Sequence, residues 1–198
     1  MKILINKLIL TPFFLGVLFL LQSCGETNTS TNPTAPAEIP DVVSASPEYA
    51  DIVNKFFEAA CRFDFDVMYE NFTDDAVQYW PDGTIESRTK ITGKAETVAW
   101  WKKWQSTSGV EKMEITNINL IPLQVNKPLK YYNVVGTAVL AYFDNLMVYK
   151  GQPTSVRMHW VFTFDDDKKI TRVFSYYDRT GIIETVKANL IKSKAAAE

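Results

Sequence analysis

The sequence is poor in residues that carry metal or nucleophilic chemistry. Its 198 residues include one histidine, His159, and two cysteines, Cys24 and Cys61. One imidazole and two thiols at this spacing do not make a zinc ligand set. The sequence also has no glycine-rich phosphate loop and no serine-centred nucleophile elbow. We therefore expect no metal site and no cofactor.

Neither sign of charge dominates. The chain has 21 basic and 23 acidic residues, which gives a formal net charge of −2. A nucleic-acid-binding domain would need a basic patch or stripe, and none is present. Hydrophobic residues make up 46% and aromatic residues 13% of the chain, enough for a sizeable core. We expect no nucleic acid partner.

The apolar run at the N-terminus, residues 8–21, is shorter than the roughly 20 residues of a membrane-spanning helix. Lys2 and Lys7 precede the main part of this run, and residues 21–24 read Leu-Gln-Ser-Cys. A basic start, a short apolar region and a cleavage site form a secretory signal peptide. The ending resembles the bacterial lipobox, in which the cysteine thiol receives a diacylglyceryl group. An ordinary signal peptide with a chance cysteine, or an N-terminal membrane anchor, is the alternative.

The lipobox predicts a lipoprotein signal peptide over residues 1–23 and lipidation of Cys24 by diacylglyceryl and an acyl chain such as palmitate. Two or more acyl chains give stable membrane anchoring. We expect the protein to be located in the bacterial cell envelope, anchored to the outer membrane, because Gly25 rather than aspartate follows the cysteine. Residues 24–46 are rich in Thr, Asn, Ser and Pro and predict a flexible tether. Cys61 is then a lone thiol, expected to pack as a small hydrophobe.

The periodicity of apolar residues changes once along the rest of the chain. Up to Ser106 it is helical and predicts helices over 47–60, 65–72 and 93–106, with a short strand at 76–80. After Gly109 it alternates with a period of two and predicts strands over 113–121, 131–144, 154–164 and 170–178. This order predicts an α+β domain in which three N-terminal helices pack on the concave face of one strongly curved antiparallel sheet.

Four short motifs add a family resemblance. They are Phe-Thr-Asp-Asp-Ala-Val at 72–77, Gly-Lys-Ala at 93–95, the Phe-Asp to Lys-Ile link at 164–170, and Tyr-Tyr-Asp at 176–178. Their order over residues 47–183 resembles the NTF2-like superfamily, in its SnoaL-like and ketosteroid-isomerase-like branch. The resemblance implies a cone-shaped domain, here 47–185, followed by a C-terminal tail over 186–198.

The resemblance also indicates where isomerase groups would lie. The aspartate base of ketosteroid isomerase falls on Trp80, the oxyanion tyrosine on Phe56 and the protonated aspartate on Trp160. An indole can only donate a hydrogen bond, and a phenyl ring cannot do that. Ketosteroid-isomerase chemistry is therefore not expected.

The same positions predict an aromatic pocket inside the cone. We expect it to be lined by Phe56, Phe72, Trp80, Trp101, Tyr142, Trp160 and Tyr177. These side chains either fill the cone or leave a slot for a flat apolar ligand, with indole N–H groups as handles. The expected function is lipid-anchored binding of a small apolar or aromatic molecule without catalysis.

Two alternatives remain open. A SnoaL-like enzyme (isomerase, hydratase or cyclase) would use Asp178, with Asp82, as base and Tyr142 as acid. An assembly module with a filled cone would instead form a homodimer through the convex face that carries Arg157 and His159.

Overall fold

The structure, a computed structural model, describes residues 39–128 and 134–191. These residues belong to one compact unit, Glu38–Glu198. The predicted signal peptide, Cys24, the tether up to residue 38 and residues 192–198 of the predicted tail lie outside the described residues.

The helices begin and end at local signals in the sequence. Helix α1 (Glu48–Cys61) follows Ser46, whose Oγ accepts a hydrogen bond from the Glu48 amide at 3.4 Å. Helix α2 (Phe65–Met68) is capped by Asp64 Oδ1, which accepts from the Val67 amide at 3.3 Å. Helix α3 (Lys94–Ser108) ends at Gly109, whose left-handed conformation (φ 76°) suits glycine.

The strands form one seven-stranded sheet in the order β1-β4-β5-β6-β7-β2-β3. Its strands are β1 (Val42–Ser44), β2 (Phe72–Tyr79), β3 (Lys90–Thr92), β4 (Val110–Val125), β5 (Gly136–Tyr149), β6 (Gln152–Phe164) and β7 (Ile170–Tyr177). Neighbouring strands are antiparallel except β2 and β7, which run parallel. A short helix α4 (Thr180–Val186) follows β7.

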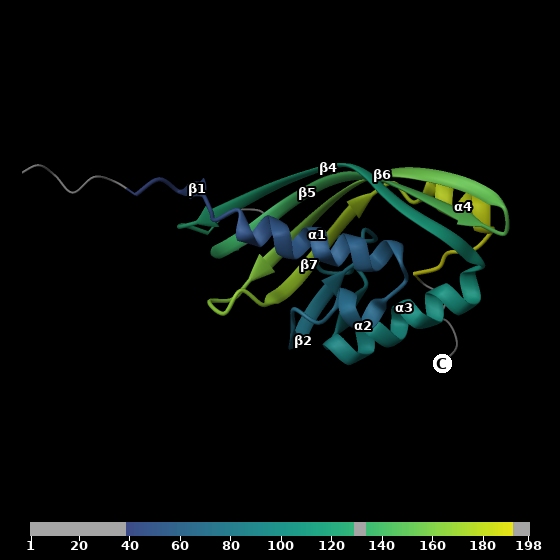
Figure 1. Cartoon of the computed structure of the whole chain (residues 1–198), viewed down its shortest axis with the longest axis horizontal. Coiled ribbons are helices and arrows are strands. Elements are labelled where there is room, and N and C mark those ends of the chain that lie inside the picture. Colours follow the sequence, from purple (N-terminus) through teal and green to yellow (C-terminus); the bar gives the residue numbers. More distant parts are fainter. Residues whose placement is uncertain (1–38, 129–133, 192–198) are drawn as a thin grey trace, which may run out of the picture. The chain divides into compact units, whose positions relative to one another are not determined.

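The sheet arches over the helices, with α1, α2 and α3 on its concave side (Figure 1). An irregularity in the β4–β5 pairing between Thr116 and Asn119 includes Asn117 in a left-handed conformation. Such bulges bend a sheet locally and increase its twist. The predicted α+β cone with N-terminal helices is confirmed, and the main hydrophobic core lies inside it. Within the described ranges, no helix has the length and apolar character to cross a bilayer.

Several predicted boundaries are wrong. Residues 42–44 do not belong to a flexible tether, since β1 pairs with the edge of β4, where free backbone groups were available. The second helix ends at Met68 rather than residue 72, because Phe72 begins β2. The domain also continues past residue 185, since Leu190 and Ile191 pack against the core.

Candidate functional site

A cavity lies between the concave face of the sheet, helices α1 and α3, and the C-terminal segment from Arg179 to Ile191. Two residue types are concentrated in its lining. All five tryptophans of the chain line it, as do all methionines except Met1. These residues are Trp80, Trp100, Trp101, Trp104, Trp160, Met68, Met113, Met147 and Met158.

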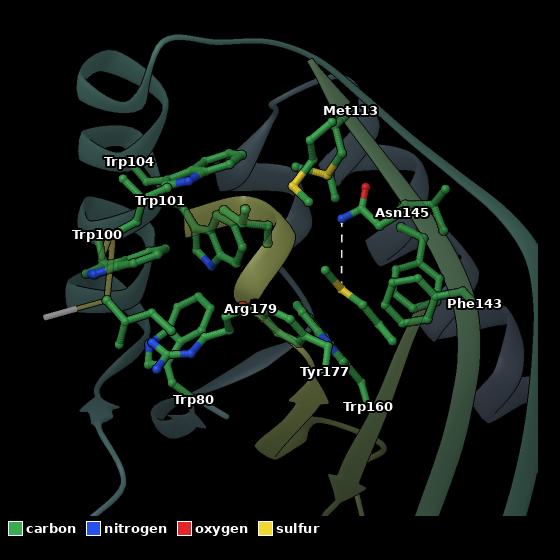
Figure 2. A pocket seen from close by; sticks show the side chains of 18 of the residues that line it. Trp80, Trp100, Trp101, Trp104, Met113, Phe143, Asn145, Trp160, Tyr177 and Arg179 are labelled. Carbon is green, nitrogen blue, oxygen red and sulfur yellow. Dashed lines mark hydrogen bonds between the residues drawn. The ribbon is translucent and has the colours of Figure 1, made fainter. Parts of the chain in front are cut away.

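Three elements bring these side chains together. Helix α3 contributes three tryptophans within five residues, which lie along one side of the cavity (Figure 2). The sheet forms the opposite side, where Met113, Phe143 and Asn145 are seen in the same view. Strand alternation explains the sheet side, because the buried positions of β5 and β6 recur every second residue from Ala141 to Tyr149 and from Thr154 to Trp160.

The cavity is narrow. Its volume is about 60 Å³, less than the roughly 150 Å³ of an engineered cavity that binds benzene. Aromatic side chains therefore fill much of the cone, but they do not fill it completely. The methionines that line the remaining slot are flexible and polarizable, so they can move to fit a ligand.

A chain of buried hydrogen bonds runs beside the cavity. Trp101 Nε1 donates to Tyr69 Oη at 2.8 Å, and Tyr69 Oη donates to Gln78 Oε1 at 3.3 Å. Gln78 Nε2 then donates to Ser175 Oγ at 2.9 Å. Burial raises the pKa of the Tyr69 hydroxyl, so it remains protonated. This network was not predicted from the sequence, although Gln78 is a polar residue at an inward-facing strand position between Ala76 and Trp80.

Three polar atoms of the cavity lining are buried without a hydrogen-bond partner in the described part of the chain. They are Trp80 Nε1, Trp160 Nε1 and Asn145 Oδ1. The other polar atom of this amide, Asn145 Nδ2, donates a long hydrogen bond to Met158 Sδ at 4.0 Å (Figure 2). Asn145 was also missed from the sequence, where it interrupts the inward series of Phe143 and Met147.

The ionisable groups that line the cavity are Tyr149, Tyr177 and Arg179; within the described residues no aspartate, glutamate or histidine lines it. Burial raises the pKa of Tyr149 and of Tyr177. Both phenols therefore stay neutral near pH 7. Arg179 Nη1 donates to Asn189 Oδ1 at 3.1 Å, which connects the end of β7 to the C-terminal segment.

The structure brings together five of the seven residues predicted for the pocket: Phe56, Trp80, Trp101, Trp160 and Tyr177. Phe72 does not line the cavity; it is buried in the core, with its ring 4.3 Å from that of Tyr69.

Tyr142 was predicted wrongly as a pocket residue. It lies on the convex face, 43% exposed, and stacks on His159 at 4.4 Å between ring centroids. The reason is strand alternation: Ala141 and Phe143 point inward, so Tyr142 between them points outward.

None of the three groups of the alternative enzyme hypothesis lines the cavity. Asp178 is exposed, and its Oδ1 accepts from the Thr180 amide at 2.9 Å, at the start of α4. That hydrogen bond lowers the pKa of Asp178, which is the opposite of what a general base needs near pH 7. Asp82 is buried, where its carboxylate accepts from the Thr89 amide at 3.0 Å and from the Thr89 hydroxyl at 2.8 Å. These hydrogen bonds connect the two ends of the loop between β2 and β3. Tyr142 lies on the convex face.

The remaining reactive groups are isolated. Cys61 is half-buried, and burial raises the pKa of its thiol. No group of three or more His, Cys, Asp or Glu residues that could hold a metal ion occurs in residues 39–128 and 134–191.

A comparison with known protein families identifies the family of this domain. A family model described as a SnoaL-like domain matches residues 53–173, more than half of the chain. The chain belongs to the SnoaL-like family. The match runs from within α1 to the centre of β7, and therefore covers most of the elements that form the cavity.

Solved structures with the same fold are distant in sequence. A candidate polyketide cyclase from Xanthomonas campestris pv. campestris is 21% identical, with a TM-score of 0.54, over 70% of this chain and 96% of its own. A candidate isomerase from Bacillus subtilis is 18% identical, with a TM-score of 0.55, over 73% and 96%. An LEH-like epoxide hydrolase of M. tuberculosis is 22% identical, with a TM-score of 0.50, over 72% and 91%. No curated protein matches the chain significantly. At these identities the structures establish the fold of this SnoaL-like domain and not its activity.

Proposed function

We propose that this SnoaL-like domain binds a small, flat, largely apolar molecule in the tryptophan-lined cavity and does not catalyse proton transfer on it. The observation that carries the proposal is the concentration of every tryptophan of the chain around one cavity. Ligand pockets are typically apolar and aromatic, with a few polar groups that set orientation. Here those polar groups are the Trp80 and Trp160 indoles and the Asn145 amide.

The chemistry of the lining supports binding rather than turnover. General acid–base catalysis needs a group that exchanges a proton near the working pH. Phe56, Trp80 and Trp160 occupy the positions that the resemblance assigns to isomerase groups. The lining tyrosines, whose pKa values are raised by burial, can donate hydrogen bonds but do not act as bases near pH 7.

Native mass spectrometry of the full chain, extracted from cells in a mild detergent, tests this function. We expect an adduct whose mass differs from detergent and phospholipid, and which is lost in Trp160→Ala and retained in Tyr142→Ala. Because all tryptophans line the cavity, ligand addition should also change the intrinsic tryptophan emission. Absence of any adduct, and of any emission change with a panel of flat apolar compounds, would contradict a binding function.

We further propose that a lipid on Cys24 anchors the domain to the outer membrane of a bacterial cell envelope, after removal of residues 1–23. The lipobox and the short apolar run support this proposal. Such an anchor would hold the cavity near the bilayer, where apolar molecules are concentrated.

Subcellular fractionation of two cysteine variants tests the anchor. Cys24→Ser should move the protein from the membrane to the soluble fraction, because position 24 then has no thiol to which a lipid can be attached. Cys61→Ser is the matched control and should leave the protein in the membrane, since Cys61 lies within the folded domain at the end of α1. Equal membrane association of both variants would contradict lipidation at Cys24.

A homodimer remains a second candidate, favoured by the partly exposed stack of Tyr142 and His159 on the convex face. Sedimentation velocity of the full chain and of Tyr142→Glu tests it. A dimer that dissociates in the variant supports assembly through this face, whereas a monomer at every concentration contradicts it.

A further inference from the structure

The three unpartnered polar atoms of the cavity indicate which hydrogen-bonding groups a ligand should carry. Trp80, Trp160 and Asn145 are 2%, 5% and 6% exposed, so water outside the protein does not satisfy their free atoms. Buried polar groups are nearly always hydrogen-bonded, and an unpaired one is costly. Two unpaired donors and one unpaired acceptor around one cavity therefore call for a partner inside it.

Similar polar groups of the core are paired within the protein, even at Trp101, which also lines the cavity. Trp101 has the same indole N–H, but it donates to Tyr69. Gln78 has the same kind of amide as Asn145, but both its oxygen and its nitrogen are paired. Two further unpartnered atoms, Thr73 Oγ1 and Arg88 Nε, belong to residues that do not line the cavity.

Strand register gives the arrangement of the free atoms. Trp160 lies opposite Ser175 in the β6–β7 pairing, and Trp80 directly follows Tyr79, which pairs with Phe174. The two indoles therefore flank Ser175 at one level of the cone. Asn145 lies four residues along β5 from Ala141, the partner of Trp160, which separates the backbones by roughly 13 Å at the usual rise per residue. The donors and the acceptor thus act at two different levels.

We infer that the ligand is a flat aromatic compound with a carbonyl-type oxygen at one end and a hydroxyl group at the other. The oxygen accepts from the Trp80 or Trp160 indole N–H, and the hydroxyl donates to Asn145 Oδ1. The ring between them lies against the aromatic and methionine side chains of the lining. This inference rests on the proposed binding function. A pure hydrocarbon would leave all three polar atoms unpaired. A compound with one polar end would pair either an indole donor or the Asn145 acceptor, but not both.

Four one-ring compounds of nearly equal size separate the two interactions. Ethylbenzene carries neither group, acetophenone the acceptor, 4-ethylphenol the hydroxyl, and 4-hydroxyacetophenone both. Isothermal titration calorimetry with the full chain should show that each group tightens binding by roughly tenfold. 4-Hydroxyacetophenone should bind tightest and ethylbenzene weakest.

Matched variants show which protein atom causes each gain in binding affinity. Trp160→Phe keeps an aromatic ring but removes the N–H, so it should reduce the gain from the carbonyl and leave the gain from the hydroxyl. Asn145→Leu should do the reverse. Thr73→Val is the control, because it removes a free polar atom that does not line the cavity; both gains should persist. Circular dichroism verifies that each variant is folded.

The outcomes distinguish the two proposals. If none of the four compounds binds at millimolar concentration, the binding function and this inference both fail. If all four bind with equal affinity, the cavity binds ligands but the assigned polarity is wrong. If Trp160→Phe weakens all four compounds equally, the indole acts through its shape and the assigned hydrogen bond is wrong.

Discussion

The two faces of strands β5, β6 and β7 carry aromatic residues in different arrangements. On the convex face, Tyr142, His159 and Tyr176 are register partners on the three strands, and their rings stack with interplanar angles of 20° and 22°. On the concave face, Phe143 and Trp160 pack against rings of α1 at angles of 52° to 62° and against each other at 73°. Cross-strand register alone produces the first arrangement. The second arrangement depends on the way in which large side chains of the helices pack against those of the sheet on its concave face.

The two faces also differ in how their polar atoms are satisfied. His159 Nδ1 lies 3.3 Å from the Ala141 carbonyl oxygen, and Arg88 Nη1 donates to Tyr176 Oη at 3.2 Å. The concave face leaves Trp80, Trp160 and Asn145 with free buried atoms. His159 and Tyr176 of the convex stack are therefore hydrogen-bonded within the protein, although Arg88 Nε beside them is also free, whereas the free atoms of the concave side belong to residues that line a cavity.

The largest difference between the faces should appear on truncation of an aromatic ring. Phe162 is fully buried on the concave face and contacts the rings of Phe56 and Phe57. Phe162→Ala should lower the free energy of unfolding by about 3–5 kcal/mol, because it removes a large buried side chain and leaves a cavity. Urea denaturation measures this change. Tyr142→Ala on the convex face is the comparison and should cost no more than about 1 kcal/mol; equal losses would contradict the contrast.

A smaller difference should follow removal of one hydroxyl group. Tyr69→Phe leaves the Trp101 N–H and Gln78 Oε1 without their partner. We expect a loss of about 1–3 kcal/mol in the free energy of unfolding, since buried polar groups lose their hydrogen bonds. Tyr142→Phe makes the same chemical change at an exposed hydroxyl and should stay within about 0.5 kcal/mol of the parent. A neutral Tyr69→Phe would show that the buried network does not stabilise the fold.

The convex face should contribute a pH dependence through His159. Burial lowers the pKa of His159 in the folded chain below its ordinary value of 6.5, although the hydrogen bond to Ala141 acts in the opposite direction. The unfolded chain therefore binds more protons in this range, and the free energy of unfolding rises with pH. The contribution is complete above about pH 7.5 and is lost as the pH falls through 6.5 towards the folded pKa.

Urea denaturation at about pH 7.5 and pH 5.5 measures this dependence. His159→Gln removes the only imidazole of the chain, so the difference in stability between the two pH values should shrink in the variant. An unchanged difference would mean that other groups, and not His159, cause it.

The smallest effect is expected at the exposed ion pair of the convex face. Arg157 Nε lies 3.5 Å from Asp144 Oδ1, and the arginine side chain is 90% exposed. Arg157→Gln should change the free energy of unfolding by less than about 0.5 kcal/mol, because water and salt screen exposed pairs. A loss well above this value would indicate that Arg157 has a buried role, as in the dimer hypothesis.

The family resemblance predicted most of the pocket residues, and strand alternation agreed with it for Trp160. Trp160 was expected on the inner face and His159 on the outer one, and both positions are observed. The same alternation assigns Tyr142 to the convex face, but the family resemblance had placed it in the pocket. Asn145 and Gln78 were overlooked because a single polar residue in an apolar strand does not reveal whether it is paired.

Three elements were not predicted from local sequence. β3 has only three residues and pairs with β2 alone, at the edge of the sheet. β1 forms only because the edge of β4, about 80 residues later in the chain, offers free hydrogen-bonding groups. Helix α4 is a short segment, and it is positioned by burial of Ile182 against the core rather than by a strong helical pattern of its own.

The sequence by itself determined the order of the three N-terminal helices and the five main strands, the curved α+β sheet and the aromatic content of the concave face. Periodicity and turn residues are local, so they can be read along the chain. Only the tertiary structure decided the narrow volume of the cavity, the contrast between the paired Trp101 and the unpaired Trp80 and Trp160, and the position of the C-terminal segment beside them. These features depend on which side chains meet across distant strands and helices, and no local pattern encodes that meeting.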